Sequence, residues 1–586
     1  MLALPQVAYF CMEYGLDSAF PIYAGGLGIL AGDYMKSSGD LKAPIIGIGL
    51  FWDRGYTRQL INTKGVIEDH YPKTPRDALR HIDAKFDVVI RGKKVPLRAW
   101  QVDRYVTSKL YLIEPEHDDD RWITERLYGG GEEDRLAQEI VLGVGGVRLL
   151  AALGHKPDVF HFNEGHAVFA GLELLRAKTF GGKTLANRIA KLRDHIVFTT
   201  HTPVPAGNEV HSLESMRKLS ADCGFSDAEL EEIGGNPFSM TVAGLHMSRV
   251  ANGVAELHGQ TARAMWKDVK RAAPIVSVTN GVHVPTWQDA RIRAALVADK
   301  PRDRQDAELW DAHQRMKYEL SCVVRERTGF ELALDRLVIG FARRAASYKR
   351  ADLILGDERH LKKLFERGVQ IIYSGKAHPR DTAGKAIVTK LVHAAKHHPG
   401  KVLFLENYDM QLGALLTRGA DVWLNNPRRP LEASGTSGMK AAMNGVPNVS
   451  ILDGWWPEGC EHGVTGWKIG DGDSGDDTVD DKTGAASGSA QHSHGSAAHT
   501  GHEDEIDPTP HSLDGSAAHP GAAGAIDRRD RSLLYHVLEH EVLPAYEERA
   551  RWIAMMRASI AMSQWRFSSD RMVEDYMAQL YRPRGS

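Results

Sequence analysis

The sequence predicts an α/β protein built on doubly wound parallel sheets. Short apolar runs, most of them rich in Val, Ile, Leu or Phe, end at Gly, Asn, His or Pro and show no strict alternation. Strands that are buried on both faces of a parallel sheet have this pattern. Longer helical patterns such as Arg135–Leu153 and Glu164–Lys178 lie between the runs. This alternation is typical of βαβ units.

The candidate strands fall into two groups, one before about Asn280 and one after about Arg336. Two Rossmann-like domains that face each other across a cleft are the simplest arrangement of two such groups. We expect an N-terminal domain over residues 1–285, a C-terminal domain over 286–560, and a helix over 561–586 that crosses back to the N-terminal domain. The candidate strands are Asp158–Phe162, His195–Thr199, Ile275–Val278, Leu337–Phe341, Val369–Tyr373, Val402–Leu405, Asp421–Leu424 and Val449–Leu452.

Composition narrows the classes of protein to consider. With 586 residues and 42% hydrophobic content, the chain can bury a large interior. A net charge of −3 without a basic run gives no reason to expect nucleic acid or an anionic membrane as a partner. The four cysteines are far apart, which indicates a reducing compartment. No signal sequence and no run of 18 apolar residues is found, so a cytoplasmic protein is expected.

One segment, Asp471–Ala525, does not fit a folded core. It is dominated by Gly, Ser, Asp, Ala and His and has almost no large apolar side chains. Such a composition cannot offset its ordering entropy, so a disordered insertion in the second domain is expected. A solvated loop is favoured over a metal-binding tract, and no metal site is predicted. The histidines of this segment are His492, His494, His499, His502, His511 and His519.

The segment Leu431–Asp453 carries the clearest chemical signal. A small-residue loop over residues 433–438 leads directly into an apparent helix, Met439–Asn444. Backbone N–H groups at such a helix start converge on an anion, although the loop by itself also suits an ordinary capped helix. Lys440, in the first turn and among small apolar residues, favours the anion site over an ordinary capped helix. A desolvated lysine beside a phosphate cradle is what covalent attachment of pyridoxal phosphate requires.

A comparison with sugar-nucleotide glycosyltransferases sharpens the prediction. Enzymes of that class with two Rossmann domains typically carry two Glu residues eight positions apart in this loop and helix, the second of which binds the nucleotide ribose. Here Glu432 occupies the first position and Lys440 the second. The expected scaffold is therefore that of a glycosyltransferase, but its ribose ligand is replaced by the candidate cofactor lysine.

At residues 432–445 the sequence EASGTSGMKAAMNG closely resembles the cofactor-lysine motif of the glycogen, starch and maltodextrin phosphorylase family. Further motifs of the family follow in the expected order over most of the chain. They are YAGGLG at 23–28, HFNEGH at 161–166, THT at 200–202, TNGV at 279–282, RRAASYKR at 343–350 and ENY at 406–408. The resemblance implies a GT-B type fold, with two Rossmann-like domains facing across a cleft.

The resemblance also implies three groups of site residues. The catalytic group comprises Arg344, Lys349, His201 and Glu432. The group that binds pyridoxal 5′-phosphate comprises Lys440 as the attachment point, Thr436, Ser437, Arg343 and Tyr408. The substrate group comprises Gly25 and Gly26, whose N–H groups face the substrate phosphate, and Asn280, Ser434 and Gly435, which contact the terminal glucose together with His201 and Glu432.

Charge balance supports a phosphate-binding role for the basic stretch 343–350, independently of the resemblance. Two phosphate groups in one dry cleft need cations, and the stretch 343–350 supplies four within eight residues. Taken alone, RRAASYKR favours an exposed basic helix start. Its position after a parallel strand, where α/β clefts bind ligands, reverses that preference. His201 alone and the glycine loop alone are weak signals.

The chain departs from the long members of the family in several places. Its match begins almost at Met1, so the N-terminal helices of nucleotide or phosphorylation control are missing and allosteric control of that kind is not expected. Ile29 stands where some members have a basic residue, and Ser437-Gly438 replaces Gly-Asn. These features resemble the short bacterial and archaeal branch.

The predicted activity is retaining phosphorolysis of the non-reducing end of an α-1,4-glucan, with inorganic phosphate as co-substrate and α-D-glucose 1-phosphate as product. Two alternatives remain: a sugar-nucleotide transferase of the glycogen-synthase type, and an inactive glucan-binding protein. Members of the family are commonly homodimers, but no interface can be identified from this sequence.

Overall fold

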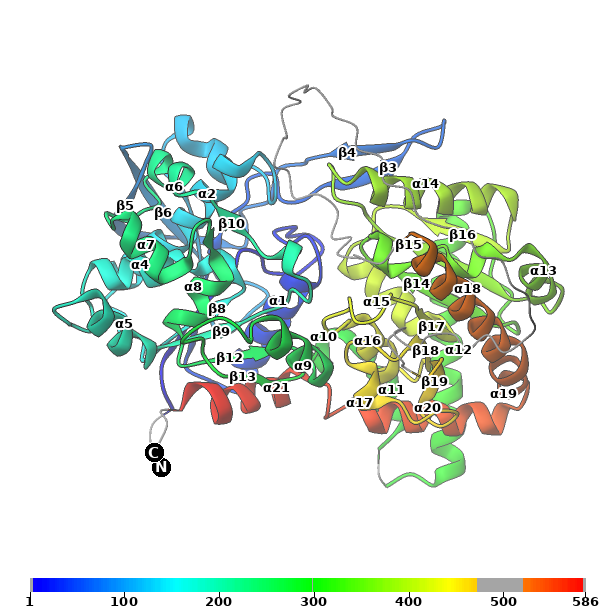
Figure 1. Cartoon of the computed structure of the whole chain (residues 1–586). Helices are drawn as coiled ribbons and strands as arrows, with labels where there is room; N and C mark the ends of the chain where they lie inside the picture. Colours follow the sequence, from blue (N-terminus) through cyan, green and yellow to red (C-terminus); the bar gives the residue numbers. More distant parts are fainter. Residues whose placement is uncertain (1–3, 298, 472–519, 583–586) are drawn as a thin grey trace, which may run out of the picture.

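The computed structural model describes residues 4–297, 299–471 and 520–582. Two large sheets, one of nine strands and one of six, lie side by side, each flanked by helices (Figure 1). All eight predicted strands are present, each within one residue of its expected limits. Within the described ranges, no helix combines the length and the apolar composition that spanning a bilayer requires.

The nine-stranded sheet has the order β13-β12-β9-β8-β1-β2-β7-β6-β5. The strands from β13 to β7 pair in parallel, whereas β6 and β5 add an antiparallel edge that the sequence analysis did not predict. Its strands are β1 (Val7–Phe10), β2 (Ile45–Leu50), β5 (Leu79–Ile90), β6 (Lys93–Val102), β7 (Lys109–Pro115), β8 (Val159–Asn163), β9 (Ile196–Thr199), β12 (Val250–Gly253) and β13 (Ile275–Ser277).

The six-stranded sheet is parallel throughout, with the order β16-β15-β14-β17-β18-β19. The chain runs outward from β14 on one side and outward from β17 on the other. Parallel sheets bind ligands at such a switch point, beyond the carboxyl ends of the strands. The strands are β14 (Val338–Ala342), β15 (Gln370–Ser374), β16 (Val402–Leu405), β17 (Val422–Asn425), β18 (Asn448–Ile451) and β19 (Gly466–Ile469).

The helices of the first half surround the nine-stranded sheet (Figure 1). The predicted helix Arg135–Leu153 is α2 and α3, joined by a π-helical turn at Val141–Gly145. The helices are α1 (Gly26–Asp40), α2 (Glu132–Ile140), α3 (Gly146–Ala152), α4 (Phe169–Arg176), α5 (Leu185–Arg193), α6 (Leu213–Leu219), α7 (Asp227–Gly234), α8 (Met240–Met247) and α9 (Glu256–Met265).

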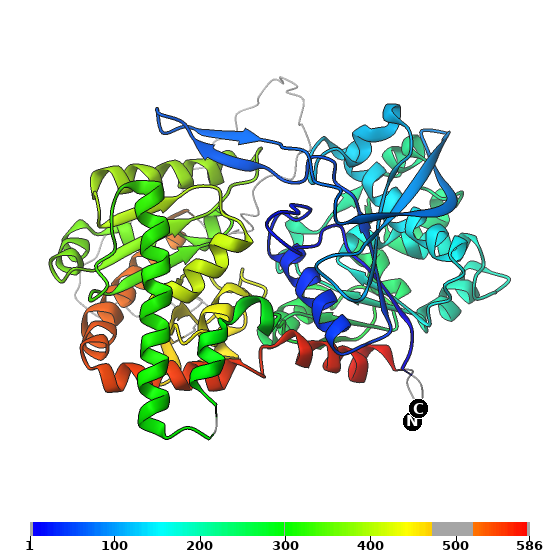
Figure 2. The ribbon, with the colours of Figure 1, turned by 180° about the vertical axis from the view of Figure 1, so that it is seen from behind.

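In the second half, the long helix α12 lies along the outer face of the six-stranded sheet (Figure 2). The helices are α10 (Val284–Trp287), α11 (Ala290–Ala295), α12 (Arg302–Thr328), α13 (Glu358–Glu366), α14 (Thr382–His397), α15 (Met410–Gly419), α16 (Ser437–Met443), α17 (Trp456–Gly459), α18 (Pro520–Val537), α19 (Leu543–Glu547), α20 (Arg549–Ser563) and α21 (Ser569–Asp575).

The C-terminal segment runs from the six-stranded sheet to the nine-stranded one (Figure 1). The Tyr34 and Tyr581 hydroxyls lie 2.6 Å apart, and so do the Ser37 and Ser569 hydroxyls. Met572 and Leu580 belong to the apolar core of the nine-stranded sheet. The end of the chain therefore holds the two halves together.

The expected insertion, residues 471–525, lies largely outside the described residues, and so do its histidines. Its expected end is too late, because α18 already begins at Pro520. The sheets lie on either side of residue 285, and the domain boundaries stay a prediction.

A hairpin, β3 (Arg58–Ile61) with β4 (Ile67–His70), reaches from the first half across to the second (Figure 1). The Ile61 N–H donates to the Glu406 carboxylate at 2.7 Å, and Lys385 pairs with Asp69 at 2.7 Å. The hairpin is thus a second connection between the halves.

A buried charge cluster docks α12 on the six-stranded sheet. The Asp421 carboxylate, directly before β17, accepts hydrogen bonds from Lys317 Nζ at 2.7 Å and from the Val338 N–H at 2.7 Å. His313 Nε2 lies 2.9 Å from the same carboxylate. All three side chains of the cluster are fully buried. It fixes the amino ends of β14 and β17 relative to each other.

Replacing Asp421 with asparagine is expected to destabilise the protein by about 3–5 kcal/mol, because it leaves Lys317 as a buried charge without a carboxylate partner. Denaturant unfolding of the purified protein at pH 7 measures the change. Asp311, an exposed carboxylate on the same helix paired with Arg315, is the matched control. Asp311→Asn is expected to shift the stability by less than about 1 kcal/mol, and equal effects of the two changes would contradict the assigned role of the cluster.

Candidate active site

A cavity of about 1730 Å³ lies between the two halves, lined by segments that follow the carboxyl ends of strands in both sheets. His201 follows β9, Arg343 and Arg344 follow β14, and Tyr408 follows β16. Every residue that the sequence analysis assigned to the site lines this cavity. These are Gly25, Gly26, His201, Asn280, Arg343, Arg344, Lys349, Tyr408, Glu432, Ser434, Gly435, Thr436, Ser437 and Lys440.

Glu432 is the anchor of the basic cluster. Its carboxylate accepts hydrogen bonds from Arg343 Nη2 at 2.7 Å and from Lys349 Nζ at 3.0 Å. Burial alone would raise the pKa of the Glu432 carboxyl, but the two cations hold that pKa at about 2. Glu432 is therefore ionised at neutral pH and fixes the positions of Arg343 and Lys349.

Arg344 differs from its neighbour Arg343. It is exposed to the cavity, and among residues 4–297, 299–471 and 520–582 no hydrogen bond or ion pair is found for its guanidinium. An arginine without a carboxylate partner keeps its donors and its charge for a ligand. Arg344 is thus a cation free to bind an anion that enters the cavity.

Lys440 lies in α16 and is buried. Its ammonium lies 3.4 Å from the ring centroid of Trp287, and no carboxylate of the described part of the chain pairs with it. Burial lowers the pKa of the Lys440 amine to about 8. The amine is therefore partly neutral near physiological pH, as a nucleophilic lysine must be.

Several polar atoms in the cavity wall are buried without a partner in the described structure. They include Arg343 Nη1, Ser434 Oγ, Asn280 Oδ1 and Asn407 Oδ1. Buried polar groups are rarely left unpaired, so a wall with several of them is suited to a polar ligand. Ser437 Oγ is already engaged, because it accepts from Trp423 Nε1 at 3.2 Å. Burial raises the pKa of the Tyr408 hydroxyl to about 12, so it stays neutral.

The glycine loop is held by a residue that the sequence analysis did not assign. The Glu13 carboxylate accepts hydrogen bonds from the Ala24 N–H at 2.5 Å, the Gly25 N–H at 3.2 Å and the Tyr128 hydroxyl at 2.8 Å. The Gly25 N–H thus already has a partner within the protein. Gly26 begins α1, and an added Cβ on either glycine would meet no atom within 4 Å, so a ligand can approach the backbone closely.

His201 is held in place by two neighbours on β8 and its following turn. Its Nε2 lies 2.7 Å from Asn163 Oδ1, and its backbone N–H donates to Glu164 Oε2 at 2.7 Å. Burial lowers the pKa of His201 to about 3, so the ring is neutral. Glu164 has a φ of +76°, a strained conformation for a residue other than glycine and one that concentrates at functional sites.

Asp453 is a further buried carboxylate that the sequence analysis missed. Its Oδ2 accepts from the Glu432 N–H at 2.9 Å, and its Oδ1 accepts from the Gly454 N–H at 2.8 Å. Burial raises the pKa of this carboxyl to about 7. No residue pattern marks it, because its partners are backbone groups. Asp453 positions the backbone of the anchor residue Glu432.

Two largely parallel sheets with basic and polar groups beyond the carboxyl ends of their strands define an α/β protein with a ligand-binding cavity between its halves. A sequence profile described as carbohydrate phosphorylase matches residues 294–458. The chain belongs to the carbohydrate phosphorylase family, and it is a glycosyltransferase of the glycogen phosphorylase type.

Three relatives support the family over nearly the whole chain. The maltodextrin phosphorylase of Thermococcus litoralis is 38% identical over 98% of this chain and 70% of the relative. The glycogen phosphorylase of Mycobacterium tuberculosis is 36% identical over 99% of this chain and 71% of the relative. The glycogen phosphorylase of Aquifex aeolicus is 34% identical over 98% of this chain and 86% of the relative.

Proposed function

We propose that this chain catalyses phosphorolysis of the non-reducing end of an α-1,4-glucan, with pyridoxal 5′-phosphate bound covalently to Lys440. The products are α-D-glucose 1-phosphate and a glucan shortened by one unit, with retained configuration. The observation that carries this proposal is a pair of unpartnered cations in one cavity, the buried Lys440 and the exposed Arg344. One suits an aldehyde cofactor and the other suits a phosphate substrate.

The residues around Lys440 fit pyridoxal phosphate. Arg343 Nη1 is buried in the cavity wall without a partner in the described structure, so it is available to an oxygen atom of a ligand. Arg343 would bind the cofactor phosphate together with Thr436 and Ser437, and Tyr408 lines the same wall. The bound cofactor supplies a phosphate group that exchanges a proton with the substrate phosphate.

The protein itself binds and orients the substrates. Arg344 and Lys349 would hold the substrate phosphate and stabilise the charge that moves during glycosyl transfer. Gly26 offers its N–H at the start of α1. Lys349 stays fixed because Glu432 accepts its hydrogen bond.

Recognition of the terminal glucose would use the polar groups on the remaining walls. Asn280 Oδ1 and Ser434 Oγ are buried acceptors without a partner in the described structure, which suits hydroxyl groups of a sugar. His201, a neutral ring whose Nε2–H donates to Asn163 Oδ1, would accept one hydrogen bond from a glucose hydroxyl at Nδ1. Gly435 and Glu432 line the same region.

The lowered pKa of Lys440 leads to a testable pH dependence of cofactor uptake. Only the neutral amine reacts with an aldehyde, so uptake by the cofactor-free protein should rise about tenfold per pH unit below about pH 8 and level off above it. The rate of appearance of the cofactor absorbance band measures this. A rise that continues to pH 10 would instead indicate a lysine with an ordinary pKa.

The activity test separates the proposal from its alternatives. Purified protein with maltooligosaccharides and inorganic phosphate is expected to release glucose 1-phosphate. Nucleotide release from UDP- or ADP-glucose would favour a sugar-nucleotide transferase, and glucan retention without either reaction would favour a binding protein.

The location and the assembly are also proposed. We place the enzyme in the cytoplasm because all four cysteines are free thiols, as in a reducing compartment. We further propose a homodimer by analogy with the family. Gel filtration with light scattering measures the assembly directly.

A further inference from the structure

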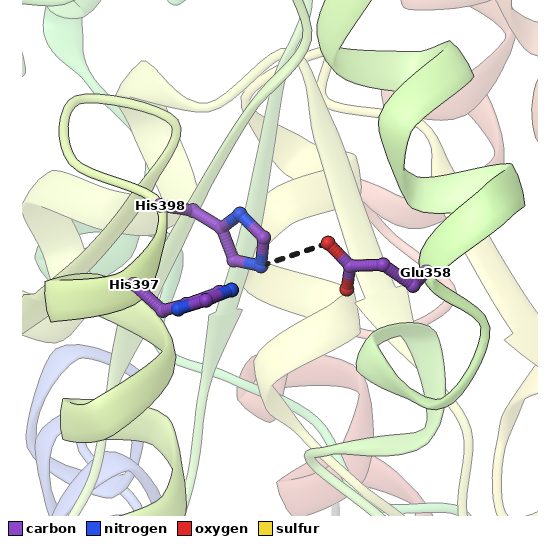
Figure 3. A group of neighbouring side chains, drawn as sticks. All are labelled: Glu358, His397 and His398. Atoms are coloured by element: carbon purple, nitrogen blue, oxygen red, sulfur yellow. Dashed lines mark ion pairs between the residues drawn. The ribbon is translucent and has the colours of Figure 1, made fainter.

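A cluster of potential metal ligands lies on the surface where α13 begins and α14 ends (Figure 3). Glu358 is the first residue of α13, His397 is the last residue of α14, and His398 follows as its C-cap. One ligand atom from each side chain lies within 4.8 Å of the other two. None of the three residues lines the active-site cavity.

The spacing within the cluster suits a shared ion better than a hydrogen bond. His398 Nε2 lies 3.7 Å from Glu358 Oε1, which is beyond hydrogen-bond length. Two ligands at about 2.0–2.1 Å from a tetrahedral zinc ion lie about 3.4 Å apart. The His397 ring stands next to that of His398, with centroids 4.7 Å apart and planes at 84° (Figure 3). Small side-chain rotations bring all three atoms into a coordination sphere.

His398 is the preorganised member of the cluster. Its side chain is only 16% exposed and its ring packs against Phe365 with centroids 5.2 Å apart. Its N–H donates to the Ala394 carbonyl at 2.9 Å, and its carbonyl accepts from the Lys401 N–H at 3.0 Å. The position of one imidazole is therefore fixed, while the exposed Glu358 and His397 are free to adjust to an ion.

The electrostatic setting favours a cation. The two histidines stand at the C-terminal end of the 16-residue helix α14, where the helix dipole is negative. The start of α13 is held in place by α18, because the Tyr535 hydroxyl donates to the Asp357 carbonyl at 3.1 Å. An ion bound here would link two helix ends that are already fixed by their surroundings.

A second group in the described part of the chain, Glu139, Glu209 and His211, has similar spacing but different chemistry. His211 Nε2 already contacts Glu139 Oε2 at 3.1 Å, and Glu209 pairs with Arg135 at 2.9 Å. These charges neutralise one another without an ion. The comparison singles out the surface cluster, because in the described residues no hydrogen bond or ion pair joins its three side chains to a group outside the cluster.

We propose that Glu358, His397 and His398 form a surface site for a late first-row divalent cation, with Zn²⁺ as its representative. Two imidazoles and one carboxylate suit zinc, nickel, copper or cobalt, whereas Mg²⁺ and Ca²⁺ prefer oxygen ligands alone. Water completes the coordination on the exposed side. The bound ion ties α13 to α14 and stabilises the half of the protein built on the six-stranded sheet, with no part in catalysis.

Zinc titration of the full-length, cofactor-loaded protein by calorimetry tests the site. The double variant His397→Ala/His398→Ala is expected to bind one zinc ion fewer than the unchanged protein. His398→Ala alone should lower the affinity for that zinc ion by more than about tenfold. Zinc should raise the thermal midpoint of the unchanged protein more than that of the double variant. Glu358→Gln should lower the zinc affinity less than the double variant does, because it keeps both imidazoles.

The control is His393→Ala, which removes an exposed histidine from the same helix outside the cluster. It should bind zinc like the unchanged protein. Because the comparison is a difference between variants, zinc bound by other histidines of the chain cancels. Equal zinc stoichiometry and affinity in the unchanged protein and the double variant would overturn the proposal. Without zinc, the double variant should have a somewhat lower thermal midpoint than the unchanged protein, because His398→Ala removes the packing of its ring on Phe365, so the zinc-induced shift is compared within each variant.

Discussion

Replacing Lys440 with alanine is expected to abolish both cofactor attachment and phosphorolysis. The amine is buried against Trp287, and no other lysine of the described chain combines that burial with a free position in the cavity wall near Thr436 and Ser437. Without the attachment point, pyridoxal phosphate would bind only through its phosphate contacts. Activity should fall to the background of the assay, which is a loss of at least about 10³-fold or about 4 kcal/mol of transition-state stabilisation.

Spectroscopy distinguishes this loss from misfolding. The unchanged protein should show a cofactor absorbance band that borohydride fixes irreversibly, and peptide mapping should place the reduced cofactor on residue 440. Lys36→Ala is the matched control, because Lys36 is largely buried, donates to Thr286 Oγ1 at 3.1 Å and does not line the cavity. It should keep the band. A Lys440→Ala protein that retains both band and activity would remove the central claim.

The buried strands are predictable because their burial is two-sided. Strands such as β9 and β14 consist of buried residues, so their sequences are nearly continuous apolar runs that stand out from the helices around them. The antiparallel edge formed by β5 and β6 escapes this criterion. In β5 buried, intermediate and exposed residues are mixed, and the strand contains Arg80, His81 and Asp83. The register of such a strand depends on its neighbours more than on its own sequence.

The residues of the site also fall into two groups, those that sequence motifs reveal and those that only the structure reveals. The position of Arg344, Lys440 and Glu432 in one cavity was predictable, because they lie in motifs whose residue types suit phosphate, aldehyde and sugar groups. Glu13 and Asp453 were not, although each holds a site element in place. Their hydrogen-bond partners are mainly backbone N–H groups, which every residue possesses, so only the three-dimensional structure reveals the contacts.

The anchor role of Glu432 adds to what the sequence analysis expected. From the resemblance it is expected to contact glucose; what the structure shows is that its carboxylate pairs with both Arg343 and Lys349. One carboxylate therefore couples the cofactor side of the cavity to the phosphate side. Arg344, which stands outside this network, is the residue through which phosphate binding can be tested separately.

Replacing Arg344 with alanine is expected to lower kcat/KM for phosphate by about 10²–10³, the loss that follows removal of one charged or polar group from a transition-state site. The guanidinium is free of protein partners in the described structure, so its removal should leave the folded cavity otherwise intact. Glucan retention on affinity gels should stay unchanged. Steady-state kinetics with phosphate varied at saturating glucan measure the effect on phosphate. Kinetics with glucan varied at saturating phosphate measure the effect on glucan.

Lys349→Ala provides the contrast. Since Lys349 also fixes Glu432, its loss should disturb both phosphate and glucan parameters, whereas Arg344→Ala should disturb only phosphate. Arg344→Lys should recover part of the lost activity, because an ammonium restores the charge but not the two-pronged contact of a guanidinium with phosphate oxygens. If Arg344→Ala raised KM for glucan and for phosphate equally, Arg344 would be a general support of the cavity wall and not the ligand of the substrate phosphate. That result would move the phosphate site to Lys349 and the start of α1.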